Sequence, residues 1–231
     1  MQKVLLAIGA HIGDMELTCG GVLASHAKKG YKIVTVALTA GERGNPKHMT
    51  QDDYRIQKVN EAKIFAEMLG GEAIVFETKD GELLPDEETK YRVAQLIRDY
   101  KPQAVFTHWK NSMHKDHANT FLIVNDAQFY AGVDVGDKVK GQTHYAPLYL
   151  CENWEDRDGF SPYVYCEVSE EGYQLWKSAI EKHWFIMNST SFKYYDYYTS
   201  IIKANGCLAR KQYAQAFNIL DYQKKVVRTD F

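Results

Sequence analysis

The chain has 231 residues, of which 45% are apolar, and this is enough to bury one substantial hydrophobic core. Its 28 basic and 30 acidic residues give a formal net charge of −2 and are interspersed, so nothing indicates attraction to nucleic acid or anionic lipid. No apolar stretch reaches the roughly 20 residues that a membrane span requires. We therefore expect a soluble globular protein whose partner is a small molecule, neither nucleic acid nor membrane.

Four short apolar runs rich in β-branched residues alternate with segments of helical period in the first half of the chain. The runs that predict strands are "KVLLAI" (3–8), "KIVTVALT" (32–39), "EAIVFET" (72–78) and "QAVFTHW" (103–109). Helices are predicted over about 14–29, 53–69 and 86–100, the second with an apolar stripe that starts at Ile56. Strands of this kind, joined by helical crossovers, predict a Rossmann-like, doubly wound α/β fold with a mainly parallel sheet and helices on both faces.

The pattern is less regular after residue 118. It predicts a helix near 118–131, strands at 146–152 and 163–169, and helices around 170–187, 191–204 and 206–220. We interpret residues 1–231 as a single domain whose topology is less determined from about residue 132. The tyrosine-rich segment "FKYYDYYTS" is typical of an aromatic helix face that packs on the core or, in a homo-oligomer, on another subunit. The alternative is a wall on which a sugar stacks.

The cysteines give information on the compartment. Cys19, Cys151, Cys166 and Cys207 are far apart and form no CxxC pair, and the first residues do not resemble a cleavable leader. We interpret them as reduced thiols of a cytoplasmic protein.

Polar side chains follow each of the four predicted strands. His11 and Asp14 follow the first strand, Glu42 the second, Asp80 the third, and "HWKNSMHKDH" (108–117) the fourth. In an open parallel sheet, ligands bind beyond the carboxyl ends of the strands, where the strand order reverses. A lone histidine after a strand is usually an ordinary loop residue, but four polar clusters on one rim favour a shared binding site.

The residue types at this rim are those that zinc prefers. His114 and His117 lie three apart in "HKDH", with Asp116 placed to accept a hydrogen bond from an imidazole and fix its tautomer. A catalytic zinc has three protein ligands and a water whose pKa falls to about 7. His11, Asp14 and one histidine of "HKDH" would complete such a site. Ligand types alone do not choose between Zn²⁺ and another divalent ion such as Fe²⁺.

Several common motifs are missing. "GAHIG" is not G-x-G-x-x-G, and it has an imidazole where a pyrophosphate would need bare backbone. The sequence contains no GK[ST], no HExxH, no H-x-E…P-C-x-x-C and no G-x-S-x-G. These observations disfavour a nucleotide-binding domain, a zinc deaminase and an α/β serine hydrolase.

Two motifs carry a resemblance to a known family. "AHIGDMELTCGG" resembles the "AHPDDxE…GG" opening of the PIG-L or LmbE-like N-acetylglucosaminyl deacetylases, and "MHKDH" resembles their "HPDH". Further segments that resemble the family in order are "LTAGERG", "NEAKIFAEMLGG", "KDGELL", "YKPQAVF" and "KQYAQAF". The resemblance is close over roughly residues 3–130. It implies a zinc enzyme that removes the acetyl group from an N-acetylglucosamine conjugate, an amino-sugar substrate.

The same resemblance implies roles for individual residues. The implied metal ligands are His11, Asp14 and His117. His114, oriented by Asp116, resembles the histidine that stabilises the oxyanion and protonates the leaving amine. Arg55 is similar to the family's substrate-binding arginine.

The sequence departs from the family at the general base. That aspartate is Gly13 here, and the preceding proline is Ile12. Loss of a general base lowers a rate by about 10² to 10⁴. Three alternatives follow: Glu16 or Glu42 substitutes for the base, the chemistry has changed, or the chain is a metal- or sugar-binding protein without turnover. The helix dipole alone explains Glu16 equally well. Met113 stands where the malate-conjugate deacetylases have an arginine, so a carboxylate-bearing aglycone loses that contact.

Overall fold

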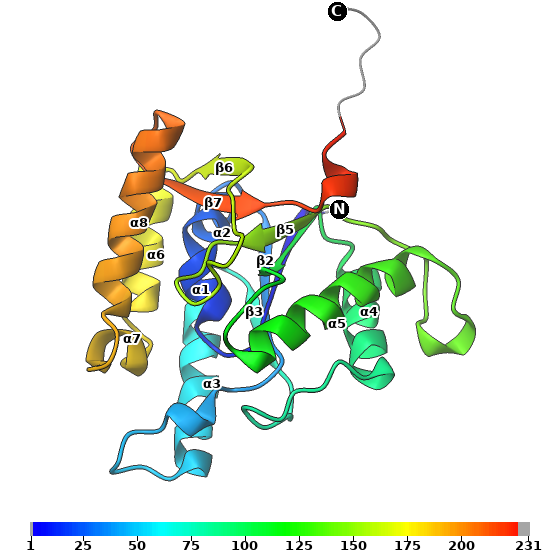
Figure 1. Cartoon of the computed structure of the whole chain (residues 1–231), viewed down its shortest axis with the longest axis horizontal. Coiled ribbons are helices and arrows are strands. Elements are labelled where there is room, and N and C mark those ends of the chain that lie inside the picture. The colour runs from blue at the N-terminus through cyan, green and yellow to red at the C-terminus, as the bar shows by residue number, and fades with distance from the viewer. Residues whose placement is uncertain (1, 226–231) are drawn as a thin grey trace, which may run out of the picture.

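The computed structural model describes residues 2–225, which form a seven-stranded sheet in the order β3-β2-β1-β4-β5-β7-β6 (Figure 1). The strands are β1 Val4–Gly9, β2 Lys32–Ala37, β3 Glu72–Val75, β4 Ala104–His108, β5 Leu148–Cys151, β6 Val164–Glu167 and β7 Ala214–Asn218. The first five strands are parallel, and β7 is antiparallel to β5 and β6. The prediction of a doubly wound, mainly parallel α/β sheet is confirmed.

Helices cover both faces of the sheet, as Figure 1 shows. One face carries α4 (Glu87–Tyr100) and α5 (Lys115–Gly132). The other carries α1 (Asp14–Thr18), α2 (Gly20–Ala27), α3 (Gln51–Met68), α6 (Glu170–Ile180), α7 (Trp184–Asn188) and α8 (Tyr194–Ala209). Successive residues of β1 alternate between the two cores, because neighbouring side chains of a strand point to opposite faces. Within residues 2–225, no helix has the length and apolar character to cross a membrane.

The predicted helix over 206–220 is wrong. Helix α8 ends at Ala209, and Ala214–Asn218 form β7, every residue of which is buried. Strand β7 lies between β5 and β6 and bonds to both. These pairings and the burial of Phe217 override the helical preference of the alanines and glutamine in "AQAFN". Two other predicted helices are each divided, at Cys19 and between Ile180 and Trp184.

Helix α3 turns a partly polar face inward. Ile56, which we predicted to lie on the buried stripe, is exposed, whereas Tyr54, Lys58, Glu61 and Phe65 are buried. A pattern of apolar residues alone does not find this face, because two of its members are charged.

The strand order brings the rim loops together. Strand β1 lies between β2 and β4, so the order reverses between β1 and β4. Helix α1 begins just after β1, and α5 begins seven residues after β4. The loops that contain His11, Asp14 and "HKDH" therefore meet at the carboxyl ends of adjacent strands.

Candidate functional site

The turn after β1 presents His11 and Asp14. Gly13 adopts a φ of 108°, a left-handed conformation that favours glycine. The Asp14 carboxylate folds back, and its Oδ2 accepts a hydrogen bond from the His11 N–H at 2.7 Å. Glu16 accepts a bond from the Gly13 N–H at 3.0 Å. These bonds fix the direction in which His11 and Asp14 project.

His117, in the first turn of α5, lies against both residues. Its Nε2 is 3.3 Å from His11 Nδ1 and 3.5 Å from Asp14 Oδ2, and these two atoms are 3.2 Å apart. A tetrahedral ion with bonds of about 2.0–2.1 Å holds its ligand atoms about 3.3 Å from one another. The three atoms therefore have the spacing of three ligands of one tetrahedral ion.

Carboxylates lie behind both histidines. His11 Nε2 is 3.2 Å from Asp80 Oδ1 and 3.5 Å from Asp116 Oδ2. His117 Nδ1 is 3.3 Å from Asp156 Oδ1. A metal-binding histidine usually donates its second N–H to a carboxylate, which fixes the tautomer and the ring orientation. This arrangement leaves His11 Nδ1 and His117 Nε2 for a metal ion.

His108, the last residue of β4, adds a second histidine layer. Its ring stacks on His117 with the centroids 4.0 Å apart. Its Nδ1 is 3.3 Å from Asp156 Oδ2, and its Nε2 is 3.1 Å from Asp14 Oδ2. Asp156 thus bridges two imidazoles. Asp14, His108 and His117 form a second group with the spacing of metal ligands.

Burial and neighbouring charges set the protonation of this cluster. Burial and the charge of His108 lower the pKa of His117 to about 4, so its ring is neutral at pH 7. Burial also acts to lower the pKa of His108, but hydrogen bonds to Asp14 and Asp156 outweigh it and raise that pKa to about 9. Burial acts to raise the pKa of Asp14, but His117 and His11 hold it well below its usual range. His117 and Asp14 are therefore in the forms that bind metal. Burial acts to lower the pKa of His11, but Asp14, Asp116 and Asp80 raise it well above its usual value, so His11 has to release a proton when a metal binds.

His114 caps the N-terminus of α5 and lies beside His11 and His117. Its Nδ1 accepts the backbone N–H of Asp116 at 3.2 Å, which puts the ring proton on Nε2. Burial and the charge of His11 lower its pKa. We expected the Asp116 carboxylate to orient His114, but that carboxylate accepts the Gly81 N–H at 2.6 Å and faces His11. The ring of His114 folds back over the N-terminus of α5 and accepts the backbone N–H of Asp116, so the Asp116 carboxylate is left to bond elsewhere.

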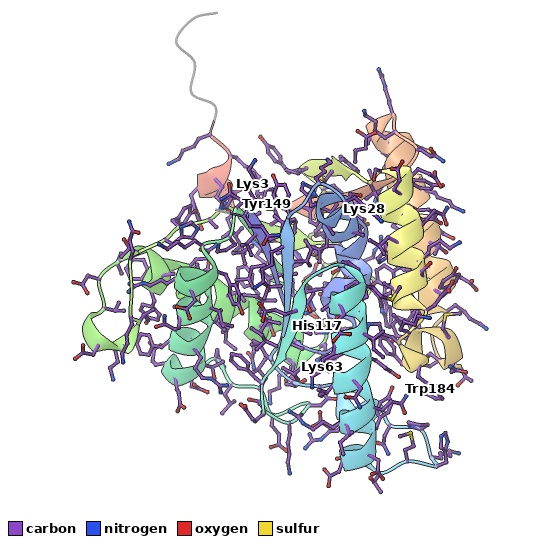
Figure 2. All side chains as sticks on the ribbon, turned by 180° about the vertical axis from the view of Figure 1, so that it is seen from behind. Lys3, Lys28, Lys63, His117, Tyr149 and Trp184 are labelled. Atoms are coloured by element: carbon purple, nitrogen blue, oxygen red, sulfur yellow. The ribbon has the colours of Figure 1, made fainter. Side chains whose placement is uncertain are left out.

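His11, Asp14, His114 and His117 form the floor of a cavity of about 540 Å³. Its walls come from residues 41–47, from α3, from residues 153–155 and from the segment 184–198. In Figure 2, His117 lies near the middle of the molecule and Trp184 on α7 near its edge. With a volume of about 540 Å³, the cavity is much larger than an acetyl group and has room for a substrate the size of a sugar.

Glu155 is the acidic side chain of the wall. Its Oε2 is 3.5 Å from His117 Nδ1. Burial, together with the charges of Asp14 and Asp156, raises its pKa to about 7. Asp14 and Asp80 also line the cavity, but both face His11.

The two residues that we predicted as substitute bases lie outside this wall. Glu16 is 3% exposed and is engaged by the Gly13 N–H. Glu42 accepts the Asp80 N–H at 3.0 Å and lies 3.4 Å from Arg55. Arg55 donates to the Phe76 carbonyl at 2.6 Å and is likewise not among the residues that line the cavity. All three support the wall from behind, and the cation that α3 contributes to the cavity is Lys58.

Phe185 fills the space beside Gly13. A Cβ built on Gly13 would lie 2.3 Å from Cζ of Phe185, far inside contact distance. The positive φ of Gly13 also disfavours a side chain there. Two independent features therefore disfavour an aspartate at this position, since Phe185 would have to shift and the backbone would be strained.

Sequence reasoning assigned no role to His108, Glu155, Asp156 or Lys58. Glu155 and Asp156 lie in "ENWEDRDG", directly after β5, which is the parallel neighbour of β4. They stand beyond the carboxyl end of a fifth parallel strand, which is the kind of position at which such a sheet binds ligands, so their place in the sequence is a usable signal. Lys58 carries no such signal, since a lysine in a helix usually faces solvent.

The PIG-L family model, described as GlcNAc-PI de-N-acetylase, matches residues 6–128, more than half of the chain. The chain belongs to the PIG-L family. The resemblance found in the sequence motifs is confirmed. The match ends before β5, so it does not include Glu155 or Asp156.

Relatives of this PIG-L protein include a hydratase as well as deacetylases. The 4-oxalmesaconate hydratase of Pseudomonas putida is 30% identical over 161 residues, which cover 65% of this chain and 61% of the hydratase. The match thus spans less than two thirds of the hydratase's own length. An uncharacterized deacetylase of Escherichia coli, YaiS, is 28% identical over 189 residues, 79% of this chain and 91% of that protein.

Solved structures show the same fold. The 4-carboxy-2-hydroxymuconate hydratase from Pseudomonas putida matches with a TM-score of 0.84 and 23% identity over the whole of both chains. The N,N'-diacetylchitobiose deacetylase from Pyrococcus horikoshii matches with a TM-score of 0.78 and 18% identity, over 94% of this chain and 84% of that one. At these identities the likeness establishes the fold alone. A deacetylase and a hydratase are thus both found among proteins of this fold.

Proposed function

We propose that this PIG-L protein is a zinc-dependent hydrolase that removes the acetyl group from an N-acetylglucosamine-type conjugate. The observation that carries the proposal is the triangle of His11 Nδ1, Asp14 Oδ2 and His117 Nε2 on the floor of a cavity of substrate size. Zn²⁺ held by these atoms would supply Lewis-acid activation of a carbonyl oxygen and of water. Fe²⁺ accepts the same ligand types and is an alternative ion.

His114 stabilises the developing negative charge in this proposal. Its Nε2–H is the free donor of the ring, because Nδ1 is engaged by the Asp116 N–H. When water attacks the amide carbon, the carbonyl oxygen gains charge, and a positioned N–H donor stabilises it. A neutral His114 has only one ring proton, and giving it to the leaving nitrogen would leave an imidazolate. We therefore assign proton delivery to another group.

Glu155 is the group to which we assign proton transfer. Of the acidic side chains that line the cavity among residues 2–225, it is the one that does not face His11. Its carboxylate would accept a proton from the attacking water and return it to the nitrogen as the C–N bond breaks. A pKa of about 7 suits both steps near neutral pH. The products are acetate and the free amine.

A second candidate reaction is the addition of water to a double bond of an unsaturated carboxylic acid. The contact between Gly13 and Phe185 favours it, because the site lacks the carboxylate that the resemblance to the deacetylases implies at position 13. The 30% identity to a hydratase points in the same direction. Both reactions need activated water and a proton-transfer group, and the same floor serves either.

One experiment distinguishes these candidates. The zinc content of the purified protein is measured by mass spectrometry, and the zinc-loaded protein is then assayed on two panels. Acetate release from N-acetylglucosamine conjugates supports the deacetylase, and hydration of unsaturated carboxylic acids, followed by ultraviolet absorbance, supports the hydratase. Zinc bound without either reaction contradicts both and leaves a metal- or sugar-binding protein. Absence of zinc binding overturns the proposed site itself.

A further inference from the structure

Lys58 is a buried cation at the cavity, and the proposed reaction gives it no role. It lies on α3, is only 5% exposed, and yet lines the cavity. We propose that the substrate carries a carboxylate group and that Lys58 binds it at the base of the cavity. This inference rests on the proposed active site and deepens it, because it names the chemical class of the substrate.

The position of the Lys58 ammonium places it beside the candidate metal ligands. Gly41, with a φ of 70°, leaves open the space that both Lys58 and His11 approach. A Cβ built on Gly41 would lie 2.7 Å from Lys58 Nζ and 3.0 Å from His11 Cβ. A substrate that reaches His11 and Asp14 therefore comes within reach of Lys58.

The ammonium has donors to spare. Its hydrogen bond goes to the Gly41 carbonyl at 3.3 Å, and within residues 2–225 it forms no ion pair at 4.0 Å or less. An ammonium has three donors, and buried charges in proteins are normally paired. Lys58 thus has unused hydrogen-bonding capacity, and the carboxylates that act on its charge, those of Asp14, Asp80, Glu16 and Glu61, lie beyond ion-pair distance.

Two aromatic rings beside the Lys58 ammonium limit where an acceptor for its free donors can lie. The ring centroid of Phe185 is 4.8 Å from Lys58 Nζ, and that of Tyr54 is 5.7 Å away. Both residues line the cavity, and their ring faces interact favourably with a cation but supply no acceptor oxygen. A molecule inside the cavity can supply the missing acceptor.

A carboxylate matches this position better than a neutral group. A hydroxyl or amide oxygen would accept a hydrogen bond but leave the charge unpaired. A carboxylate accepts the hydrogen bond and also pairs with the charge. The same cation replaces the contact that Met113 fails to provide. Met113 is 80% exposed and is not among the residues that line the cavity, whereas Lys58 lines the cavity from α3. A carboxylate-bearing substrate thus regains a partner at a different point of the wall.

The test measures binding on the zinc-loaded protein, so it does not depend on turnover. Acetate, malonate, succinate and glutarate are titrated by calorimetry into the wild type, Lys58→Met and Lys63→Met. Lys63 lies on α3 five residues further on and faces solvent, so its substitution removes the same charge from the same helix (Figure 2). Succinamide is the neutral probe of matched shape. Melting curves check that the variants fold, and methionine keeps the aliphatic length of lysine.

We expect at least one dicarboxylate to bind the wild type and Lys63→Met equally. Lys58→Met should bind it about 10- to 100-fold more weakly, the loss of one hydrogen bond to a charged group. Succinamide should not distinguish the variants. The inference is overturned if none of the four acids binds, if Lys58→Met binds them as well as wild type, or if it weakens succinamide equally.

The outcomes also separate this inference from the proposed function. Acetate release from a neutral conjugate that Lys58→Met leaves unchanged supports the deacetylase and overturns the carboxylate site. Lys58-dependent binding of a dicarboxylate, without either reaction, supports the carboxylate site and overturns the proposed catalysis.

Discussion

The floor of the cavity and its wall are built in different ways. The floor consists of short, polar rim loops fixed to parallel strands, in which His11, Asp14 and His117 are held by hydrogen bonds and carboxylates. The wall from 184–198 combines aromatic side chains of α7 and α8 with the polar residues 188–191, and Phe192, between these helices, stacks on Trp154 with the centroids 4.1 Å apart. The strand ends thus hold the groups that can carry out chemistry, whereas the C-terminal helices and the segment between them shape the space above.

The largest effect is expected from removing a candidate metal ligand of the floor. His117→Ala should abolish stoichiometric zinc binding and lower any turnover at least about a thousandfold, because metal activation is worth several kcal/mol. Zinc content and rate are measured together. His144→Ala is the control, since His144 is a partly buried histidine that bonds to the Pro102 carbonyl rather than to the site. If His117→Ala keeps its zinc, the ion is bound by another group of residues.

Glu155 belongs to the wall but contacts His117 of the floor. Glu155→Gln should lower turnover by about a hundredfold or more while zinc binding is retained, as expected for loss of a general base. The base works in its ionised form, so the wild-type rate should rise as the pH increases through about 7, the raised pKa of Glu155. Glu155→Gln should lack this limb of the pH profile. An unchanged profile would assign the proton transfer to a different residue.

Asp156 supports the floor from behind. Asp156→Asn should weaken zinc binding about 10- to 100-fold, because it removes the carboxylate that holds both His108 and His117. Asp158→Asn is the matched control, since Asp158 lies in the same loop and is exposed. The metal affinities are compared by competition with a chelator. Equal affinities for the two variants would show that Asp156 does not orient the ligands.

The same division explains how much of the molecule the sequence predicts. His11, Asp14, His114 and His117 follow strands whose apolar runs are continuous, so their meeting on one rim follows from the topology of a parallel sheet. The sequence does not predict β7, because its side chains favour a helix until two neighbouring strands pair with it.

The position of Phe185 could not be predicted either. It lies 172 residues from Gly13 in the sequence, and only the packing of α7 brings the two together. Lys58 is hidden from pattern analysis for a related reason, since burial of a charge depends on tertiary neighbours rather than on helical period.

The smallest prediction concerns the contact at which floor and wall meet. Gly13→Asp should not raise the activity and should lower the free energy of unfolding by about 1–3 kcal/mol, through the strained φ and the overlap with Phe185. Denaturant unfolding measures this for Gly13→Asp, Phe185→Ala and the double variant. Because the overlap requires both side chains, the double variant should be more stable than the sum of the single effects predicts, and the remaining loss is the cost of the backbone conformation. Strict additivity would mean that the wall does not press on the turn. In that case the absence of an aspartate at position 13 would reflect the backbone of the floor alone.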